Sequence, residues 1–129
     1  MALDACEVYR PAKPAMISPI IVLGMHRSGT SIISRSLESL GLFQGVRFED
    51  NHESTFFLEL NRSLIRHVHG WWDHPEPLHA FFKRPQAVEM TIARLAKTLC
   101  SIHAREYLGW KRLVRYRSMF NLPYPWGWK

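Results

Sequence analysis

The feature that most constrains this chain is a loop framed by two glycines, between a short apolar run and a helix-like stretch. The loop reads Gly24-Met25-His26-Arg27-Ser28-Gly29-Thr30-Ser31, after the apolar residues 19–23 and before residues 32–40. Glycines spaced G-x-x-x-x-G allow a tight turn that points successive N–H groups inward, and the following helix adds the positive end of its dipole. The sequence therefore predicts a phosphate-binding loop, and we expect its anionic ligand to be a nucleotide.

The loop differs from a Walker A motif at the position that matters most for nucleoside triphosphates. A Walker A loop reads G-x-x-x-x-G-K-[ST], and its Lys contacts the terminal phosphates. Here Thr30 occupies the Lys position, and the positive charge of the loop is Arg27. Arg27 can bind a phosphate, while Thr30 and Ser31 add hydroxyl groups at the helix start. These loop residues disfavour an ATP or GTP hydrolase. They favour a loop that binds an anion over a turn that binds nothing.

Hydrophobic periodicity predicts about three helices and at most two strands. A strand buried on both faces is expected at residues 20–23, followed by a helix from Thr30 or Ser31 that stops at Gly41. A second helix carries the apolar stripe of residues 56–68, capped by Asn51 or Ser54. Residues 70–85 are expected to be a loop whose aromatic residues act as core and loop anchors. A long helix is predicted over residues 86–107, and the basic residues 105–117 continue it as an amphipathic helix.

Length and composition are those of one modest soluble domain, which is too short to be a full nucleotide-dependent α/β enzyme. It has 129 residues, 47% of them hydrophobic, and a formal charge of +6, which favours anionic partners. Cys6 and Cys100 lack a metal-like or redox-like spacing, so we expect reduced thiols. The first 16 residues do not resemble a secretory signal, and no apolar run is long enough to span a membrane. We therefore expect a cytoplasmic protein without a membrane span, in which residues 1–18 form a flexible lead-in.

Four short motifs follow one another along residues 19–129. They are PIIVLGMHRSGTSIISRSLESL at residues 19–40, DNHESTFFLELN at 50–61, WDHPEP at 72–77 and WGWK at 126–129. In order and spacing they resemble the sulfotransferases that use 3′-phosphoadenosine-5′-phosphosulfate, specifically the bacterial-type family with a GMHRSGTS signature. The resemblance implies an α/β fold of the P-loop-like, three-layer sulfotransferase type. In that family the W-G-W-K segment continues into an Asp-Pro-Arg stretch and the elements that hold the 3′-phosphate. We therefore expect residues 19–129 to be the amino-terminal part of such a domain, incomplete and helix-rich.

The resemblance also assigns roles to residues of this chain. It implies that Arg27, Ser28, Gly29, Thr30 and Ser31 bind the 5′-phosphate and sulfonate end of the donor. The reaction needs no metal, because hydrogen-bond donors and cations can stabilise the leaving phosphate. A general base must deprotonate a hydroxyl or amine acceptor, possible acceptors including carbohydrates and other hydroxylated molecules. Glu53 is the first candidate for this base and His52 the second, with helix capping as the alternative role of both.

Three other interpretations of the sequence stay beside this one. A catalytically inactive anion-binding or interaction module would follow from an incomplete sheet with exposed apolar faces. The basic and aromatic residues 105–117 are compatible with nucleic-acid binding, but we interpret them as a solvated helix face because no nucleic-acid motif accompanies them. Metal binding is disfavoured because the closest histidines, His67 and His69, point to different sides of a helix.

Overall fold

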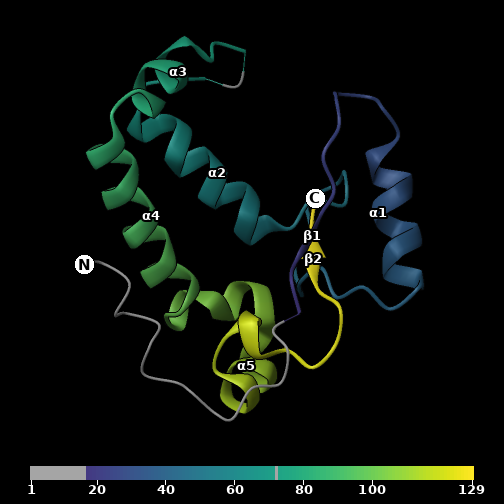
Figure 1. Ribbon diagram of the computed structural model, residues 1–129. Helices are drawn as coiled ribbons and strands as arrows, with labels where there is room; N and C mark the ends of the chain where they lie inside the picture. Colours follow the sequence, from purple (N-terminus) through teal and green to yellow (C-terminus); the bar gives the residue numbers. More distant parts are fainter. Residues whose placement is uncertain (1–16, 72) are drawn as a thin grey trace.

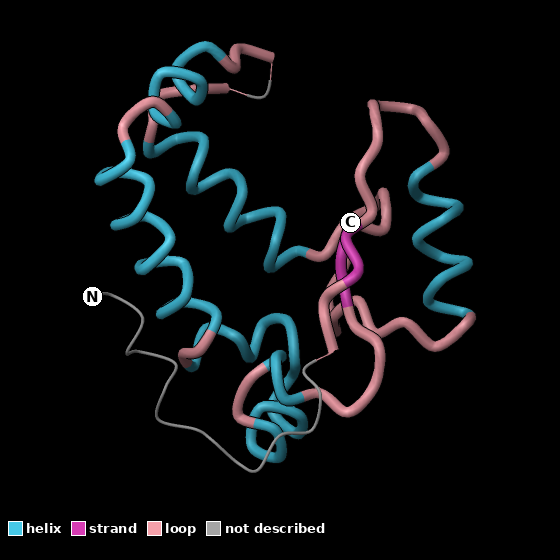
Figure 2. Tube along the Cα trace, viewed as in Figure 1, coloured by secondary structure: helices cyan, strands magenta, loops and turns pink. Residues whose placement is uncertain are grey.

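The computed structural model describes residues 17–71 and 73–129, which form a mostly helical domain of mixed α/β class. In Figure 1 the two short strands lie between α1 on one side and the α2–α4 pair on the other. Figure 2 shows that long loops connect α1 to the two strands and to α2. The described elements are β1 (Ile20–Ile21), α1 (Thr30–Ser39), α2 (Thr55–His67), α3 (Glu76–Phe82), α4 (Pro85–Leu99), α5 (Arg105–Tyr116) and β2 (Gly127–Trp128), with 3₁₀ turns at Ile102–Ala104 and Met119–Asn121.

The two strands pair in parallel and join the two ends of the described chain. Ile20 lies opposite Gly127, and the N–H groups of Ile20 and Val22 each donate to a carbonyl of the β2 segment at 2.9 Å. On its other edge β2 donates from Gly127 N–H to Phe43 O, also at 2.9 Å. The strands approach so closely that a Cβ on Gly127 would stand 1.8 Å from Ile20 O. Glycine is therefore required at residue 127 by the strand pairing itself.

The first strand differs from its predicted form in length and in burial. It covers Ile20–Ile21 instead of residues 20–23, and the expectation of burial on both faces is wrong. Ile20 and Ile21 are 44% and 47% exposed, and β1 pairs with a single strand in the described sheet.

The first two helices confirm the predictions from periodicity. α1 begins at Thr30 and ends at Ser39, just before Gly41, which has a φ of +99° that favours glycine. α2 covers Thr55–His67 with Ser54 at its N-cap position. The inward contact of α1 is polar, however. Ser34 is fully buried in this helix, whereas Ile32 is 73% exposed.

The predictions for residues 70–107 are partly wrong. A helix, α3, lies inside the expected loop, and the expected long helix ends at Leu99. Pro77 and Pro85 lie in the first turns of α3 and α4, where proline is compatible with helical backbone. After α4 the Ser101 hydroxyl accepts a hydrogen bond from the His103 N–H and begins a 3₁₀ turn, which separates α4 from α5. α5 then confirms the predicted helical continuation, with a kink at Gly109.

The aromatic residues of the segment 70–85 are more exposed than expected. Trp71 is 60% exposed and Phe82 is 61% exposed, so neither is a core anchor. Phe81 is half-buried and packs edge-on against Phe82. Trp72, Cys6 and nearly all of the expected lead-in lie outside the described residues. Across the part of the chain that the structure describes, none of the helices combines the length and the apolar character that a membrane crossing requires.

The hydrophobic core lies where α5, β2 and the start of α2 meet. Tyr107 stands at its centre, fully buried, and its hydroxyl donates to Gly127 O at 2.7 Å, with Phe43 O 3.1 Å away. Trp128 stacks on Phe57 with ring centroids 3.8 Å apart. This core holds β2 in place from the side opposite α1. Its buried members are Phe56, Phe57, Ala104, Tyr107, Leu108, Met119, Leu122 and Trp126.

Candidate anion-binding site

The backbone of the predicted phosphate loop turns tightly between β1 and α1. Arg27 and Gly29 have left-handed φ values of +61° and +84°, and the Ser28 N–H donates to Met25 O at 3.0 Å. A Cβ on Gly24 would lie 2.4 Å from the Thr30 side chain. Gly24 is therefore needed for the close return of the loop, and Gly29 for its left-handed backbone.

The loop ends at a helix N-terminus that suits an anion. Gly29 occupies the N-cap position of α1 and offers no side-chain oxygen to the first N–H groups, and the first turn contains no acidic residue. The helix dipole and these N–H groups favour negative charge at this end. Arg27 is exposed two residues earlier and adds a full positive charge to the loop.

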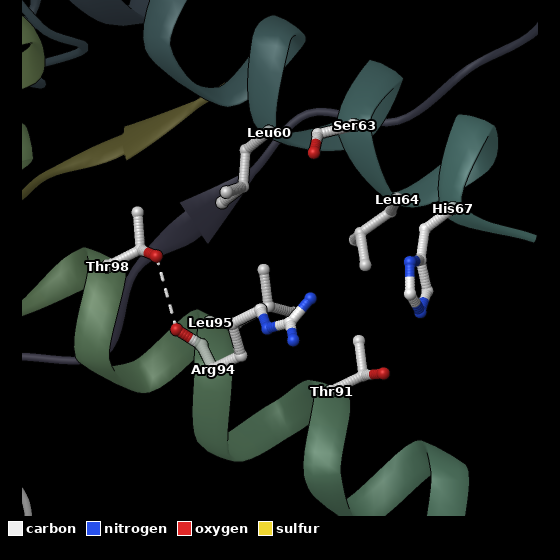
Figure 3. Close-up of a pocket in the computed structure, with 8 residues that line it drawn as sticks. All are labelled: Leu60, Ser63, Leu64, His67, Thr91, Arg94, Leu95 and Thr98. Carbon is white, nitrogen blue, oxygen red and sulfur yellow. Dashed lines mark hydrogen bonds between the residues drawn. The ribbon is translucent and has the colours of Figure 1, made fainter.

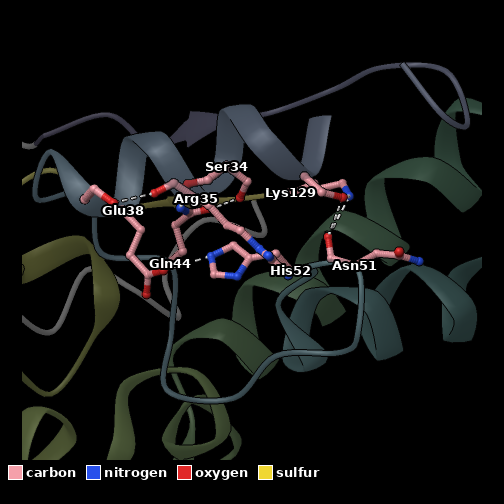
Figure 4. Close-up of polar contacts among 9 residues, drawn as sticks. Ser34, Arg35, Glu38, Gln44, Asn51, His52 and Lys129 are labelled. Carbon is pink, nitrogen blue, oxygen red and sulfur yellow. Dashed lines mark hydrogen bonds and ion pairs between the residues drawn. The ribbon is translucent and has the colours of Figure 1, made fainter. Parts of the chain in front are cut away.

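A second cation, Lys129, lies at the start of α1, although no local sequence signal predicted it there. Its Nζ donates to Asn51 O at 2.8 Å (Figure 4). It also donates to Ser31 Oγ at 2.8 Å, and Ser31 Oγ donates to the same carbonyl of Asn51 at 2.9 Å. The Lys129 side chain is only 11% exposed. These contacts join three segments that are far apart in the sequence.

The alternation of side chains along β2 explains the position of Lys129. Trp126 and Trp128 point to one side and enter the aromatic core, where Trp126 is 1% exposed. Side chains alternate along a strand, so Gly127 and Lys129 belong to the other face, where Lys129 contacts Ser31 of α1. The alternation in W-G-W-K indicates that the tryptophans and the lysine lie on opposite faces of a strand. Which elements pack against each face depends on the strand pairing, which the local sequence does not reveal.

The two candidate bases lie at different ends of α1. Glu53 Oε1 is 3.9 Å from Lys129 Nζ, so Glu53 joins the group at the helix start. His52 stacks on Phe48, and its Nε2 lies 3.0 Å from Glu38 Oε2, within ion-pair distance. Glu38 is seven residues after Ser31, or about 10 Å along the helix axis. The structure thus brings Glu53, but not His52, to the start of α1.

A buried polar pair fixes the orientation of α1 (Figure 4). The Ser34 hydroxyl donates to Gln44 Oε1, and Gln44 Nε2 donates to Ser34 O at 2.7 Å. Both residues are almost completely buried, and each satisfies the other. The pair holds the middle of α1 against the segment that also pairs with β2, so the helix start cannot shift freely relative to Lys129.

A separate small groove lies between α2 and α4, with a volume of about 100 Å³ (Figure 3). Three leucines form its apolar part, and Arg94 and His67 are among its polar lining residues. None of the residues that line it belongs to the loop, to the segment 51–53 or to β2. The residues that line the groove are Leu60, Ser63, Leu64, His67, Thr91, Arg94, Leu95 and Thr98.

Within the described ranges, no group of three or more His, Cys, Asp or Glu side chains lies close enough together to hold a metal ion.

Comparison with known proteins adds no assignment. No protein family, curated protein or solved structure matches this chain.

Proposed function

We propose that the chain binds 3′-phosphoadenosine-5′-phosphosulfate at residues 24–31 and transfers its sulfonate to a hydroxyl or amine acceptor in the cytoplasm. The observation that carries the proposal is the left-handed turn through Arg27 and Gly29 at an uncapped start of α1. Backbone N–H groups and a guanidinium arranged in this way bind a phosphate well. The order of the four sequence motifs supports a phosphosulfate donor over a nucleoside triphosphate.

The proposed reaction needs three contributions from the chain. The acceptor oxygen or nitrogen forms a bond to sulfur, while the bond from sulfur to the bridging oxygen breaks and its electron pair stays on the 5′-phosphate. Arg27 and the first N–H groups of α1 stabilise that charge. A base takes the acceptor proton, and Glu53 is the better placed candidate because it lies near the helix start. His52 would need a different acceptor position, since it lies beside Glu38.

Titration calorimetry with adenosine 3′,5′-bisphosphate, the expected product, tests donor binding. We expect binding by the full chain and a loss of about 10-fold or more in affinity for Arg27→Gly, because a charge-assisted hydrogen bond contributes about 1.5–3 kcal/mol. Glycine also relieves the left-handed backbone of residue 27, so unfolding would not explain the loss.

Arg117→Gly is the matched control for this variant. Arg117 is exposed and has a φ of +63°, so the control makes the same substitution in the same backbone conformation at the end of α5. We expect it to bind like the unchanged protein. Failure of the unchanged protein to bind the bisphosphate, or equal loss in both variants, would overturn the proposed site.

A second candidate function is an anion-binding or interaction module that transfers nothing. It is favoured by the exposed apolar side chains on β1, on α1 and at the C-cap of α1, where Ile32 of the helix is 73% and the C-cap residue Leu40 is 85% exposed. Incubation of the protein with labelled donor and a panel of carbohydrate, phenol and amine acceptors separates the two functions. Sulfonated product that disappears in Arg27→Gly supports the transferase, whereas binding without turnover supports the module.

A further inference from the structure

We infer that the outer face of α5 docks the protein on the surface of an anionic lipid bilayer. The inference does not depend on the proposed function, because no residue of this face belongs to the candidate anion-binding site. α5 lies at the end of the molecule opposite α3 (Figure 1). The outer face consists of the exposed residues Trp110, Lys111, Val114 and Arg115, with Arg105 before them and Arg117 after them.

The spacing of these residues places them together on the side of α5 that faces away from the core. Trp110 and Val114 are four residues apart, and so are Lys111 and Arg115, so each pair follows the helix axis. The four positions cover about 140° of the helix circumference, the apolar pair beside the basic pair. Leu113, on the opposite side, packs against the core. The core contacts thus hold α5 with its outer face towards solvent.

The apolar pair of the outer face suits the headgroup region of a bilayer. Trp110 is 58% exposed and Val114 is 75% exposed. The Arg105 guanidinium lies over the Trp110 ring, 5.5 Å from its centroid, so one face of the indole is already covered. Stacking on a nucleic-acid base would use only the remaining ring face and would give Val114 no partner. A bilayer interface accommodates the indole and the aliphatic side chain together, beside cations.

The charge of this part of the chain complements an anionic surface. Residues 90–129 contain eight Lys and Arg but one acidic residue, Glu106, and thus carry the whole positive excess of the chain, whose net charge is +6. Glu106 already pairs with Arg47 at 2.7 Å and with Arg105 at 3.1 Å. No carboxylate of this segment therefore remains to repel anionic headgroups.

Three cations of the outer face are available to such headgroups. Among the described residues, none forms an ion pair with Lys111, Arg115 or Arg117, which are all exposed. Each basic residue close to an anionic leaflet strengthens binding by about 5-fold. The long stems of these side chains carry the charge to the headgroups while the apolar pair enters the interface. A neutral bilayer would satisfy only the apolar pair.

Cosedimentation of the full chain with phosphatidylcholine vesicles, with and without about one-third phosphatidylserine, tests the inference. We expect about 100-fold stronger partition onto the anionic vesicles, lost when the salt rises from about 0.1 M to about 1 M. Replacing both Lys111→Gln and Arg115→Gln should lower this partition about 30-fold. Trp110→Ser should lower it about 10-fold, because less apolar surface leaves water on binding.

Matched controls come from the other end of the molecule. Trp71 is 60% exposed, nearly as much as Trp110, so Trp71→Ser removes a similar apolar surface. Lys83 and Arg84 are exposed between α3 and α4, so Lys83→Gln with Arg84→Gln removes the same charge as the basic double variant. We expect both controls to bind the anionic vesicles like the unchanged protein.

The possible outcomes decide the inference in either direction. Absence of binding to the anionic vesicles, or equal binding to both kinds of vesicle, overturns it. Equal losses in Trp110→Ser and Trp71→Ser also overturn it. Binding of single-stranded DNA that Trp110→Ser abolishes, measured by fluorescence anisotropy and without vesicle binding, would assign the face to nucleic acid instead. If Trp110→Ser does not fold, Val114→Ser takes its place, with a loss of partition again expected.

Discussion

The contact between Gly127 and Ile20 allows one substitution to be worked out in detail. In Gly127→Ala the new Cβ would stand 1.8 Å from Ile20 O and 2.8 Å from Ile20 C, both backbone atoms. β1 must therefore retreat by at least about 1 Å, since Cβ contacts below 3.0 Å essentially never occur. A shift of that size lengthens the 2.9 Å bonds from Ile20 N–H and Val22 N–H beyond hydrogen-bonding distance.

The cost of this separation follows from the contacts that are lost. Two backbone hydrogen bonds contribute about 1 kcal/mol each, and the local overpacking adds about 1–3 kcal/mol. We expect Gly127→Ala to lower the free energy of unfolding by about 3–5 kcal/mol. For a chain of this size the midpoint of thermal unfolding would fall by roughly 10–20 °C.

Two measurements check this prediction. Thermal unfolding by circular dichroism gives the midpoint, and amide hydrogen exchange gives the protection of Ile20 and Val22, which should fall towards that of an unpaired chain. Gly41→Ala is the control, because its Cβ meets open space and only the left-handed backbone opposes it, at about 1–2 kcal/mol. A Gly127→Ala midpoint within 2 °C of the unchanged protein, with protection retained, would refute the close strand pairing.

Two further predictions concern the core and the candidate base. Tyr107→Phe should lower the free energy of unfolding in urea by about 1–2 kcal/mol, because the buried Gly127 carbonyl loses its hydroxyl donor. Burial raises the pKa of Tyr107 above its ordinary value of 10.0. Above pH 10 this tyrosine therefore ionises in unfolded chains but stays neutral in folded ones, so the unchanged protein should lose stability as the pH rises. Tyr107→Phe should lose less stability over the same pH range. Glu53→Gln should tighten bisphosphate binding a few-fold, since it removes a negative charge 3.9 Å from Lys129 Nζ, and slow turnover by about 100-fold or more. Unchanged turnover in this variant would exclude Glu53 as the base.

Local patterns predicted the loop, α1 and α2 because the determinants of these elements lie within a few residues of each other. Glycines 24 and 29 set the turn, and Gly41 follows the end of the first helix. The pattern did not reveal that α1 turns a serine, not its isoleucines, towards the protein. The reason is non-local: Gln44 returns beside Ser34, and two buried polar groups can be accommodated only when they bond to each other.

The errors at residues 70–107 have a different origin. Prolines 77 and 85 are typical of loops, but proline is also compatible with the first turn of a helix, where both residues lie. The break after Leu99 depends on Ser101, whose hydroxyl caps the next turn. Apolar periodicity continues across that break, so a count of apolar positions cannot detect it.

The position of Lys129 shows why the candidate site could be found only in part from the sequence. Arg27 and Ser31 belong to one contiguous motif, and a local pattern was enough to identify them. Lys129 reaches Ser31 across 98 positions of sequence because β2 pairs with β1 and a glycine permits their close approach. The strand pairing that carries the loop thus also sets the distance from Lys129 to the loop. A change that loosens this pairing should weaken anion binding even where no ligand-contacting residue is altered, so Gly127→Ala is expected to lose affinity together with stability.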